Sequence, residues 1–115
     1  MTKSPPRVQR RVDLSFVPRF EYGDQAQVAV FCDEADGVEL GAGYARMTGA
    51  RIPWTIRYDE TILVIEGELT IHANGEALTA GPGDSVFLPS GTELIYEADS
   101  ALLFYAIHPA NWASS

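Results

Sequence analysis

The sequence predicts an all-β fold, a small antiparallel barrel or double-sheet jelly roll in a single domain. From residue 66 onward, short apolar segments alternate with turn residues about every eight to ten positions, as in small barrels. Asn74-Gly75 separates two such segments in the manner of a two-residue hairpin. No stretch has the period of a long amphipathic helix, and 115 residues with 46% hydrophobic content suit one compact domain.

The best-defined strand is expected at residues 61–65, TILVI, because β-branched residues dominate the run and Gly67 closes it. Its apolar character predicts burial on both faces. Glu60 stands at its entrance. A carboxylate in that position is costly unless it is paired, hydrogen-bonded, bound to a metal or neutralised by a raised pKa. Glu60 is therefore the centre of the candidate site.

The remaining strands are bounded by glycine, proline and acidic residues. They are expected at residues 26–32, 37–47, 68–73, 76–80, 85–88 and 101–107. Gly41 and Gly43 interrupt the second of these segments and predict a bulge or a close backbone approach. A turn is expected at residues 98–100, before the last apolar segment.

Residues 1–20 are expected to form an N-terminal arm, mobile or swapped onto a partner subunit, and residues 21–115 the barrel. Prolines and alternating charges leave the arm with too few apolar groups to offset the entropy lost on ordering, unless a partner surface receives them. Pro18 restricts the end of the arm to an edge or irregular segment.

The net charge of −8 is unevenly distributed along the chain. Five of the eight basic residues lie in the first nineteen positions: Lys3, Arg7, Arg10, Arg11 and Arg19. From residue 20 onward, fifteen acids face only Arg46, Arg51 and Arg57, and repulsion of phosphates argues against a nucleic-acid-binding body. The basic arm is expected to lie against the acidic body or against a neighbouring subunit.

Cysteine content and hydropathy bear on the compartment. Cys32 is the only cysteine, which excludes an internal disulfide and fits a reducing environment. No apolar stretch reaches 18 residues, and no apolar segment follows the basic N-terminus, so neither a membrane span nor a signal peptide is indicated. A cytoplasmic protein that binds neither membranes nor nucleic acid is expected.

Two short patterns resemble the motifs of cupins, which are barrels of the double-stranded β-helix type. The interval from Glu60 to Gly67 is similar to the second half of the first motif, and GD-x-x-x-L-P-x-G at residues 83–91 is similar to the second. A closer resemblance links the chain to the cupin domains of the EutQ family of ethanolamine utilisation proteins. It rests on GAGY (41–44), PWT with YDE (53–60), EGEL (66–69), AGPGD with FLPSG (80–91) and PANW (109–112).

The same resemblance implies a site without the usual cupin metal. A metal-binding cupin supplies three histidines and one glutamate, which leave positions open for substrate. Here the histidine positions fall on Pro53 and Thr55 or on Trp54 and Ile56, depending on the gap counted, and on Leu94. His72 and His108 lie outside the motif and are expected at the surface or at strand ends. We therefore expect Glu60 to be retained with no metal and no tightly bound cofactor.

In a cupin barrel the motif glutamate points into the cavity, and alternation places Tyr58 on the same side of the strand. Aromatic surroundings disfavour the charged carboxyl, so Glu60 is expected to act as a general acid or base, with Tyr58 and Tyr105 as catalytic partners. Ligand contacts are expected from Trp54, Tyr44, Arg46, Tyr96 and Arg57. The alternative is a structural Glu60 that hydrogen-bonds a tyrosine or a backbone amide and only holds the barrel mouth.

Two hypotheses on function remain open. Similarity to EutQ implies a role in ethanolamine and acetate catabolism, with an acetate kinase-type activity on a small carboxylate, ATP and Mg²⁺. The chain has no G-x-x-x-x-G-K-[ST] loop, so phosphates would fall to the three body arginines, and Mg²⁺ to Glu60 and a second carboxylate. The other hypothesis is a non-catalytic cupin that binds a small ligand as an accessory of a catabolic pathway. A homodimer is expected in both cases, because small cupins leave a sheet face and edge strands to cover.

Overall fold

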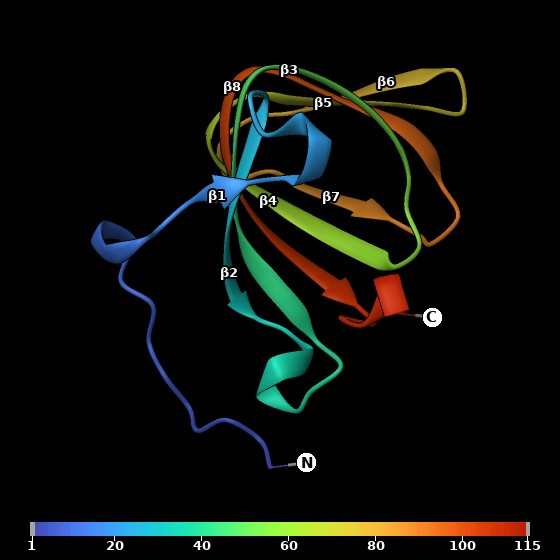
Figure 1. Ribbon diagram of the computed structural model, residues 1–115. Coiled ribbons are helices and arrows are strands. Elements are labelled where there is room, and N and C mark those ends of the chain that lie inside the picture. Colours follow the sequence, from blue (N-terminus) through green and yellow to red (C-terminus); the bar gives the residue numbers. More distant parts are fainter. Residues whose placement is uncertain (1, 115) are drawn as a thin grey trace.

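The computed structural model describes residues 2–114, which form one antiparallel sheet that curls into a barrel (Figure 1). The strands lie in the order β1-β2-β3-β8-β4-β7, and β5 pairs with both β6 and β8. The strands are β1 (Val17–Pro18), β2 (Ala26–Cys32), β3 (Gly41–Thr55), β4 (Asp59–Gly67), β5 (Leu69–Ala73), β6 (Glu76–Ala80), β7 (Ser85–Leu88) and β8 (Glu93–His108). Four 3-10 turns accompany them: η1 (Arg11–Asp13), η2 (Phe20–Tyr22), η3 (Glu34–Asp36) and η4 (Trp112–Ser114). The all-β prediction is confirmed.

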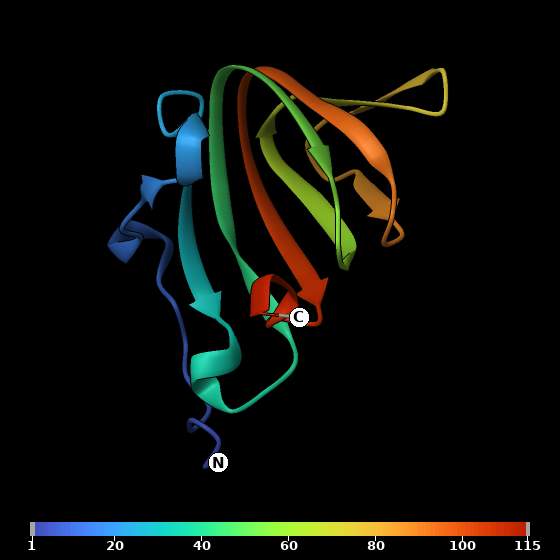
Figure 2. The ribbon, with the colours of Figure 1, turned by 45° about the vertical axis from the view of Figure 1, so that its right-hand side comes forward.

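The two longest strands, β3 and β8, pair from Gly41 opposite Ile107 to Thr55 opposite Glu93. Both arch over the top of the barrel in Figures 1 and 2. The C-terminal half of β8 pairs with β4, whereas its N-terminal half pairs with β5, so one strand contributes to both walls. Strands that continue from one wall into the other curve the sheet around a central space.

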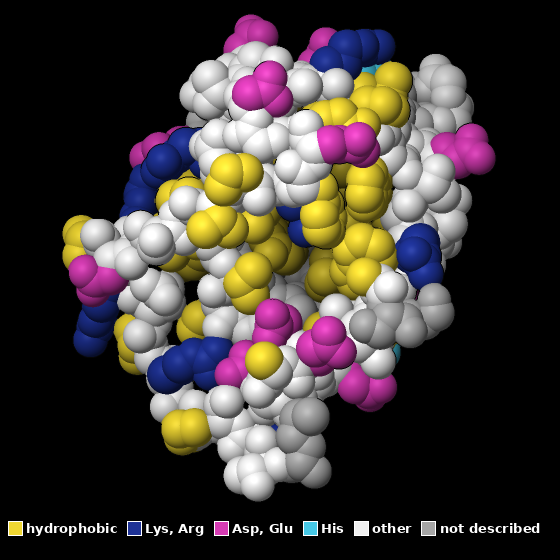
Figure 3. Space-filling view, viewed as in Figure 1, with side chains coloured by type: hydrophobic (Ala, Val, Ile, Leu, Met, Phe, Trp, Pro, Cys, Tyr) yellow, Lys and Arg dark blue, Asp and Glu magenta, His cyan; other side chains and the backbone are white. Residues whose placement is uncertain are grey.

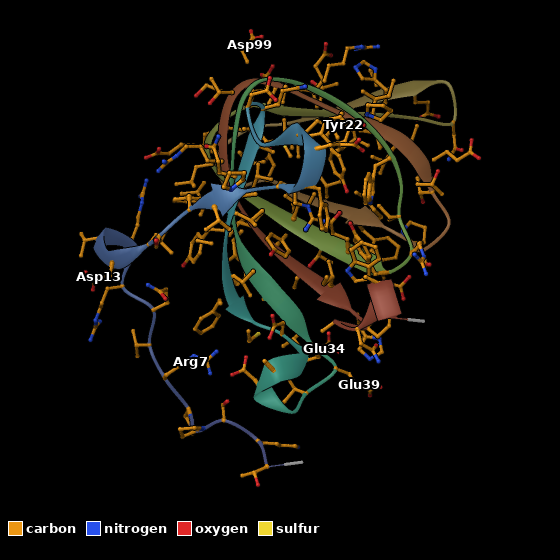
Figure 4. All side chains as sticks on the ribbon, viewed as in Figure 1. Arg7, Asp13, Tyr22, Glu34, Glu39 and Asp99 are labelled. Carbon is orange, nitrogen blue, oxygen red and sulfur yellow. The ribbon has the colours of Figure 1, made fainter. Side chains whose placement is uncertain are left out.

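The turn predicted at residues 98–100 is wrong, because β8 runs through them and bends instead. β3 bends at the same level, at Gly49, whose φ of 52° suits glycine. Because β3 bends at Gly49 without ending, the strand that was predicted to end at residue 47 continues to Thr55. Asp99 points away from the barrel at this bend, at the top of Figure 4. Polar residues stay solvated at a bend as they do at a turn, so here they indicate curvature of a continuous ladder.

The predicted strand at residues 61–65 is confirmed within β4, but its predicted burial on both faces is wrong. Glu60, Ile62 and Val64 are buried, while Leu63 on the other face is 41% exposed. An antiparallel sheet packs one face on the core and leaves the other face accessible. The inward face is completed by the fully buried side chains Ile56, Leu69, Ile71 and Leu103.

The hairpin predicted at Asn74-Gly75 is confirmed. Ala73 pairs with Glu76 across it, and both central residues have positive φ, 54° and 76°, as a type I′ turn requires. The two strands that it joins, β5 and β6, extend to the upper right of Figure 1. Among residues 2–114, no helix is both long enough and apolar enough to cross a membrane.

The N-terminal arm runs along the side of the barrel beside β2 (Figure 2). The backbone amide of Ser4 donates to the carbonyl of Asp36 at 2.9 Å, and the Arg7 guanidinium pairs with the Asp36 carboxylate at 3.0 Å. Hydrogen bonds from the side chains of Ser4 and Arg7 to the carboxyl lower the pKa of Asp36 to about 2. Arg11 pairs with Glu66 at the other end of the arm. In this structure the arm therefore lies on its own acidic body, and its mobility or exchange between subunits stays a prediction.

We expect the protein to be a homodimer in solution. The chain exposes 6783 Å², about a tenth more than the roughly 6,200 Å² of a compact monomer of its mass. Leu63 and Phe87 are exposed diagonal neighbours on the outer face of β4 and β7, and β7 ends the sheet. Sedimentation velocity is expected to give a dimer that Phe87→Ser weakens and that Leu40→Ser, at another exposed apolar position, leaves intact. A wild-type monomer at micromolar concentration would contradict this expectation.

Candidate functional site

The barrel contains a cavity of about 90 Å³, partly open to solvent, between β2, β3, β4 and β8. Its walls are apolar, with Met47, Ile52, Ile62 and Leu103 among them. In Figure 3, hydrophobic side chains gather in the middle of this face, where the surface is hollowed and where Figure 1 places η2 above β4 and β7. The polar groups that line the cavity belong to Arg19, Tyr22, Trp54, Tyr58, Glu60, Tyr96 and Tyr105.

Glu60 is the central polar group of this cavity. It is 7% exposed, and among the described residues it is the one charged residue that is buried. Alternation along β4 turns it inward together with Ile62. The Tyr96 hydroxyl, from the far wall of the barrel, donates to Glu60 Oε1 at 2.8 Å. Glu60 therefore forms the hydrogen bond to a tyrosine that a purely structural role would require. This bond does not by itself exclude chemistry at the carboxyl.

Burial raises the pKa of Glu60 to about 7, because the charged form loses hydration. The hydrogen bond from Tyr96 and the positive charge of Arg19 oppose this shift without cancelling it. Burial raises the pKa of Tyr96, and the negative charge of Glu60 raises it further. The same two causes raise the pKa of Tyr58 to about 12. Both phenols thus remain protonated near neutral pH, while Glu60 populates both of its protonation states. A carboxyl with that property is suited to accept or donate a proton.

Tyr105 reaches the cavity from β8, where it pairs with Gly43 of β3. A Cβ at Gly43 would lie 2.8 Å from the Tyr105 hydroxyl oxygen and 2.7 Å from the carbonyl oxygen of Ala29. The close backbone approach predicted for this glycine is confirmed, and its reason is the space that the phenol needs. Burial raises the pKa of Tyr105 as well.

Arg19 is a cavity residue that the sequence reasoning left in the arm. Its backbone amide donates to the carbonyl of Ala26 at 2.9 Å, which holds it next to β2, and its side chain lines the cavity. The guanidinium lies 4.5 Å from the centre of the Phe20 ring. In the sequence, the only signal is a single basic residue in the otherwise apolar and aromatic run FVPRF.

Aromatic rings pack together at the mouth of the cavity, on the side of Phe20, which lines the cavity and is 60% exposed. The Phe20 ring stacks on Trp54 with centroids 6.1 Å apart and planes 10° apart, and Trp112 meets both rings nearly edge-on. Tyr58 also contacts Trp112, at 5.1 Å. Two of the segments that carried the family resemblance, PWT and PANW, thus meet here although they are far apart in the sequence.

The expectation that Tyr44 and Arg46 line the cavity is wrong. Their neighbours Ala45 and Met47 face it, and alternation along β3 turns Tyr44 and Arg46 to the outer face of the sheet. The Tyr44 ring packs edge-on against the Phe104 ring, with ring centroids 5.1 Å apart. The Arg46 guanidinium lies over the ring of Phe16. The prediction failed because the sequence alone did not indicate which face of β3 turns inward.

The other body arginines do not converge on Glu60 either. Arg57 is exposed beside the mouth, where its guanidinium lies 5.7 Å from the centre of the Trp112 ring, and it does not line the cavity. Arg51 forms an ion pair with Glu97 at 3.1 Å on the surface. The structure therefore brings together Trp54, Tyr58, Glu60, Tyr96 and Tyr105 of the predicted site residues, and it does not bring together the predicted arginine cluster.

The residues around Glu60 do not fit the metal centre of a metal-binding cupin. The position of the third histidine is Leu94, which is buried opposite Trp54. His72 instead bonds to Glu97 at 2.7 Å, and His108 is exposed at the end of β8. Within residues 2–114, no group of three or more His, Cys, Asp or Glu side chains could hold a metal ion. Glu60 is a single oxygen donor among phenols and apolar groups, which suits none of the usual metal geometries.

Purified protein is therefore expected to carry well under one transition-metal ion per chain, and chelation is expected to leave its Tm unchanged. Elemental analysis and thermal melts with and without EDTA measure both quantities. Stoichiometric nickel, zinc, iron or manganese that is lost in Glu60→Gln would contradict this prediction.

A curled antiparallel sheet around a cavity, with an inward glutamate on the motif strand, defines this protein as a cupin. In agreement, a solved RmlC-like cupin from Shewanella frigidimarina superposes with a TM-score of 0.75 at 19% identity, over 100% of both chains. The chain belongs to the EutQ family: the family described as "Ethanolamine utilisation protein EutQ" matches residues 12–114.

Individual relatives agree with this assignment. Acetate kinase EutQ of Salmonella typhimurium is 39% identical over 82 residues, which cover 70% of this chain and 36% of the relative. The structure of the Clostridium difficile EutQ protein superposes with a TM-score of 0.73 at 30% identity, over 78% of this chain and 66% of that chain. The chain thus spans about a third of the length of the first curated relatives that it matches, 36% and 34%.

Proposed function

We propose that this chain carries out acid–base chemistry on a small metabolite of ethanolamine and acetate catabolism, with Glu60 as the group that transfers the proton. The observation that carries this proposal is the position of Glu60: it is buried, its pKa is about 7, and it lines the barrel cavity. A general acid or base works best with a pKa near the operating pH. Tyr96 orients the carboxyl, and Tyr58 and Tyr105 offer hydroxyl donors to the ligand.

The size of the cavity limits the enclosed ligand. About 90 Å³ is well below the roughly 300–1,000 Å³ of pockets that enclose drug-sized molecules. A molecule of a few non-hydrogen atoms, such as acetate or ethanolamine, is the size that this space favours. A nucleotide would have to bind outside it, at the aromatic mouth.

The activity to test first is phosphoryl transfer between ATP and acetate, because the matched relatives carry the name acetate kinase. Acetate attacks the γ-phosphate as its carboxylate and releases no proton, so in this reaction Glu60 would act by binding and orienting the acetate rather than by removing a proton. In that reaction Arg57 would be the basic group nearest an ATP molecule at the mouth, and Arg19 the one inside the cavity. No second carboxylate lines the cavity beside Glu60 among the described residues. Mg²⁺ would therefore arrive with the nucleotide, as is usual for this ion.

The test is acetyl phosphate formation from acetate and MgATP, trapped as the hydroxamate, by wild type and by Glu60→Gln. Wild-type turnover that Glu60→Gln lowers supports a role of Glu60 in this reaction. Binding of acetate or ethanolamine without turnover, measured by calorimetry, would favour the second candidate, a non-catalytic accessory cupin. The apolar cavity and the dispersed body arginines are the observations in favour of that candidate.

A further inference from the structure

Glu60 has one carboxylate oxygen that is free to take a proton. Tyr96 donates to Oε1 at 2.8 Å, and within residues 2–114 no donor reaches Oε2. Oε2 is not fully buried, so it keeps surface open to the cavity that Glu60 lines. Phosphoryl transfer to acetate would leave this property of the carboxyl unused, because that reaction releases no proton. A substrate that gives up a proton would use it.

The hydroxyl of Tyr105 is an unpaired donor in the same cavity. Among the described residues it has no acceptor, and it is not fully buried either. Its ring occupies space that Gly43 leaves, because a Cβ there would lie 2.8 Å from the hydroxyl oxygen. Tyr105 pairs with Ile62, which lies two residues from Glu60 on the inward face of β4, so Tyr105 and Glu60 are diagonal neighbours. A base and a hydrogen-bond donor thus face one small space.

Arg19 places a positive charge beside both groups. Its guanidinium is half-buried and lines the cavity, where it pairs with no carboxylate of the described chain. It is held over the Phe20 ring, 4.5 Å from the ring centre. Its charge opposes the rise that burial causes in the pKa of Glu60 and in that of Tyr105. A fixed positive charge in a poorly hydrated site stabilises negative charge that develops next to it.

Glu60, Tyr105 and Arg19 supply what removal of a proton from carbon requires: a base, and two groups that stabilise the resulting oxyanion. We propose, resting on the proton transfer proposed above for Glu60, that the substrate is a small neutral aldehyde or ketone, which this site converts to its enolate. Glu60 Oε2 takes a proton from the carbon next to the carbonyl group. The electron pair of the broken C–H bond forms a C=C bond, and the carbonyl π pair moves to the oxygen, which Tyr105 and Arg19 hold. Return of the proton from Glu60 restores the carboxylate, so no co-reactant is needed.

The charges of the site favour a neutral substrate. Glu60 must be charged to accept a proton, and a charged Glu60 repels a substrate carboxylate, whereas Arg19 repels an ammonium group. A neutral carbonyl compound becomes negative only as its proton leaves, and Tyr105 and Arg19 then bind it more strongly than before. An interaction that strengthens in the transition state is one that accelerates the reaction. The apolar walls around Ile62 and Leu103 suit the alkyl part of such a molecule.

The experiment is hydrogen–deuterium exchange of acetone, hydroxyacetone and acetate by the full chain in D₂O, followed by proton NMR. The wild type is expected to exchange the α-hydrogens of both ketones at least about tenfold faster than buffer alone, and not those of acetate. Glu60→Gln is expected to lower the rate about 10²-fold or more. Tyr105→Phe and Arg19→Met are each expected to lower kcat about 10- to 100-fold with little change in KM, because both groups act on charge that forms in the transition state.

The pH dependence is a second readout of the same experiment. The exchange rate is expected to rise with pH and to level off above about pH 7, as Glu60 becomes fully charged. Exchange in buffer alone instead continues to rise in proportion to hydroxide. Burial raises the pKa of the phenols next to Glu60, so they keep their protons over this range. The titratable groups that line the cavity with Glu60 are Arg19, Tyr22, Tyr58, Tyr96 and Tyr105.

Two variants on the outer face of the sheet are the matched controls. Tyr44→Phe removes a strand phenol that packs against Phe104 outside the cavity, and Arg46→Met removes a guanidinium that also lies over a phenylalanine ring. Both are expected to keep the wild-type rate. Thermal melts of each variant confirm folding, and Arg19→Lys, which keeps the charge, is expected to recover part of the rate lost in Arg19→Met.

No exchange of either ketone above the buffer rate, or exchange of acetate as fast as of the ketones, would overturn the inference. The role of Glu60 in acetyl phosphate formation would then stand or fall by its own assay. Exchange that Glu60→Gln removes but that Tyr105→Phe and Arg19→Met retain would refute the oxyanion site and leave the proposed proton transfer standing. Exchange that survives in Glu60→Gln would refute the proposed function itself.

Discussion

Glu60→Gln is expected to lower turnover by about 10² to 10⁴, the usual contribution of a general acid or base. Gln keeps the size of the side chain and can still accept the 2.8 Å hydrogen bond from Tyr96, but it has no titratable proton. Tyr58→Phe and Tyr105→Phe are expected to give smaller losses, because each removes one hydroxyl from the cavity. Turnover of the metabolite that wild type converts measures all three variants, and acetyl phosphate formation, trapped as the hydroxamate, is the first assay.

The same substitution is expected to stabilise the fold at pH 8. Glu60 has a folded-state pKa of about 7 against an ordinary value of 4.5. Because the folded value is the higher one, the stability linked to this group is fully present below about pH 4.5 and is lost as pH rises through about 7. The full shift corresponds to roughly 3 kcal/mol, and Gln removes the part that comes from burying the charge. The melting temperature of Glu60→Gln should therefore exceed that of wild type most at pH 8 and least at pH 4.5.

A purely structural Glu60 would give the reverse pattern. Glu60→Gln would then melt several degrees below wild type at every pH and keep its activity or ligand affinity. Retained activity together with lost stability would show that Glu60 is not the group that carries out the chemistry. Arg46→Met again serves as the control for both readouts, since Arg46 does not line the cavity.

Gly67→Ala is expected to destabilise the protein by about 4 kcal/mol or more, enough to prevent folding of many small domains. Gly67 ends β4 with φ of 78°, and a Cβ there would lie 1.9 Å from the carbonyl oxygen of Ser100 in β8. Backbone atoms of a paired strand cannot move aside cheaply, so the conformational strain and the steric clash act together. Urea denaturation measures the free energy of unfolding.

Gly75→Ala is the matched control. Gly75 has nearly the same φ, 76°, but a Cβ there would meet nothing within 4 Å. It therefore reports the conformational cost alone, about 1 kcal/mol. Equal losses of stability in the two variants would show that the close approach of β8 to Gly67 is unimportant and would remove this account of the β4–β5 junction.

The fold class, and the presence of an unusual carboxylate at Glu60, were predictable from the sequence. Alternation, turn residues and the Asn74-Gly75 hairpin are local signals, because they depend on a few consecutive residues and the conformations that those residues allow. Glu60 could be found in the same way, since a carboxylate at the edge of an apolar run requires an explanation wherever the strand lies. The lost histidine positions followed from the resemblance to cupins, whose motifs indicate where those side chains would stand in this sequence.

Only the tertiary structure decided which side chains meet Glu60. Arg19 entered the cavity and Arg46 left it, because the first depends on how residues before β2 cross the barrel mouth and the second on which face of β3 turns inward. The bend at Gly49 replaced a predicted turn for a similar reason. A polar residue in the sequence indicates access to water, but its face and its distant partners are set by strand pairing, which local propensity does not specify.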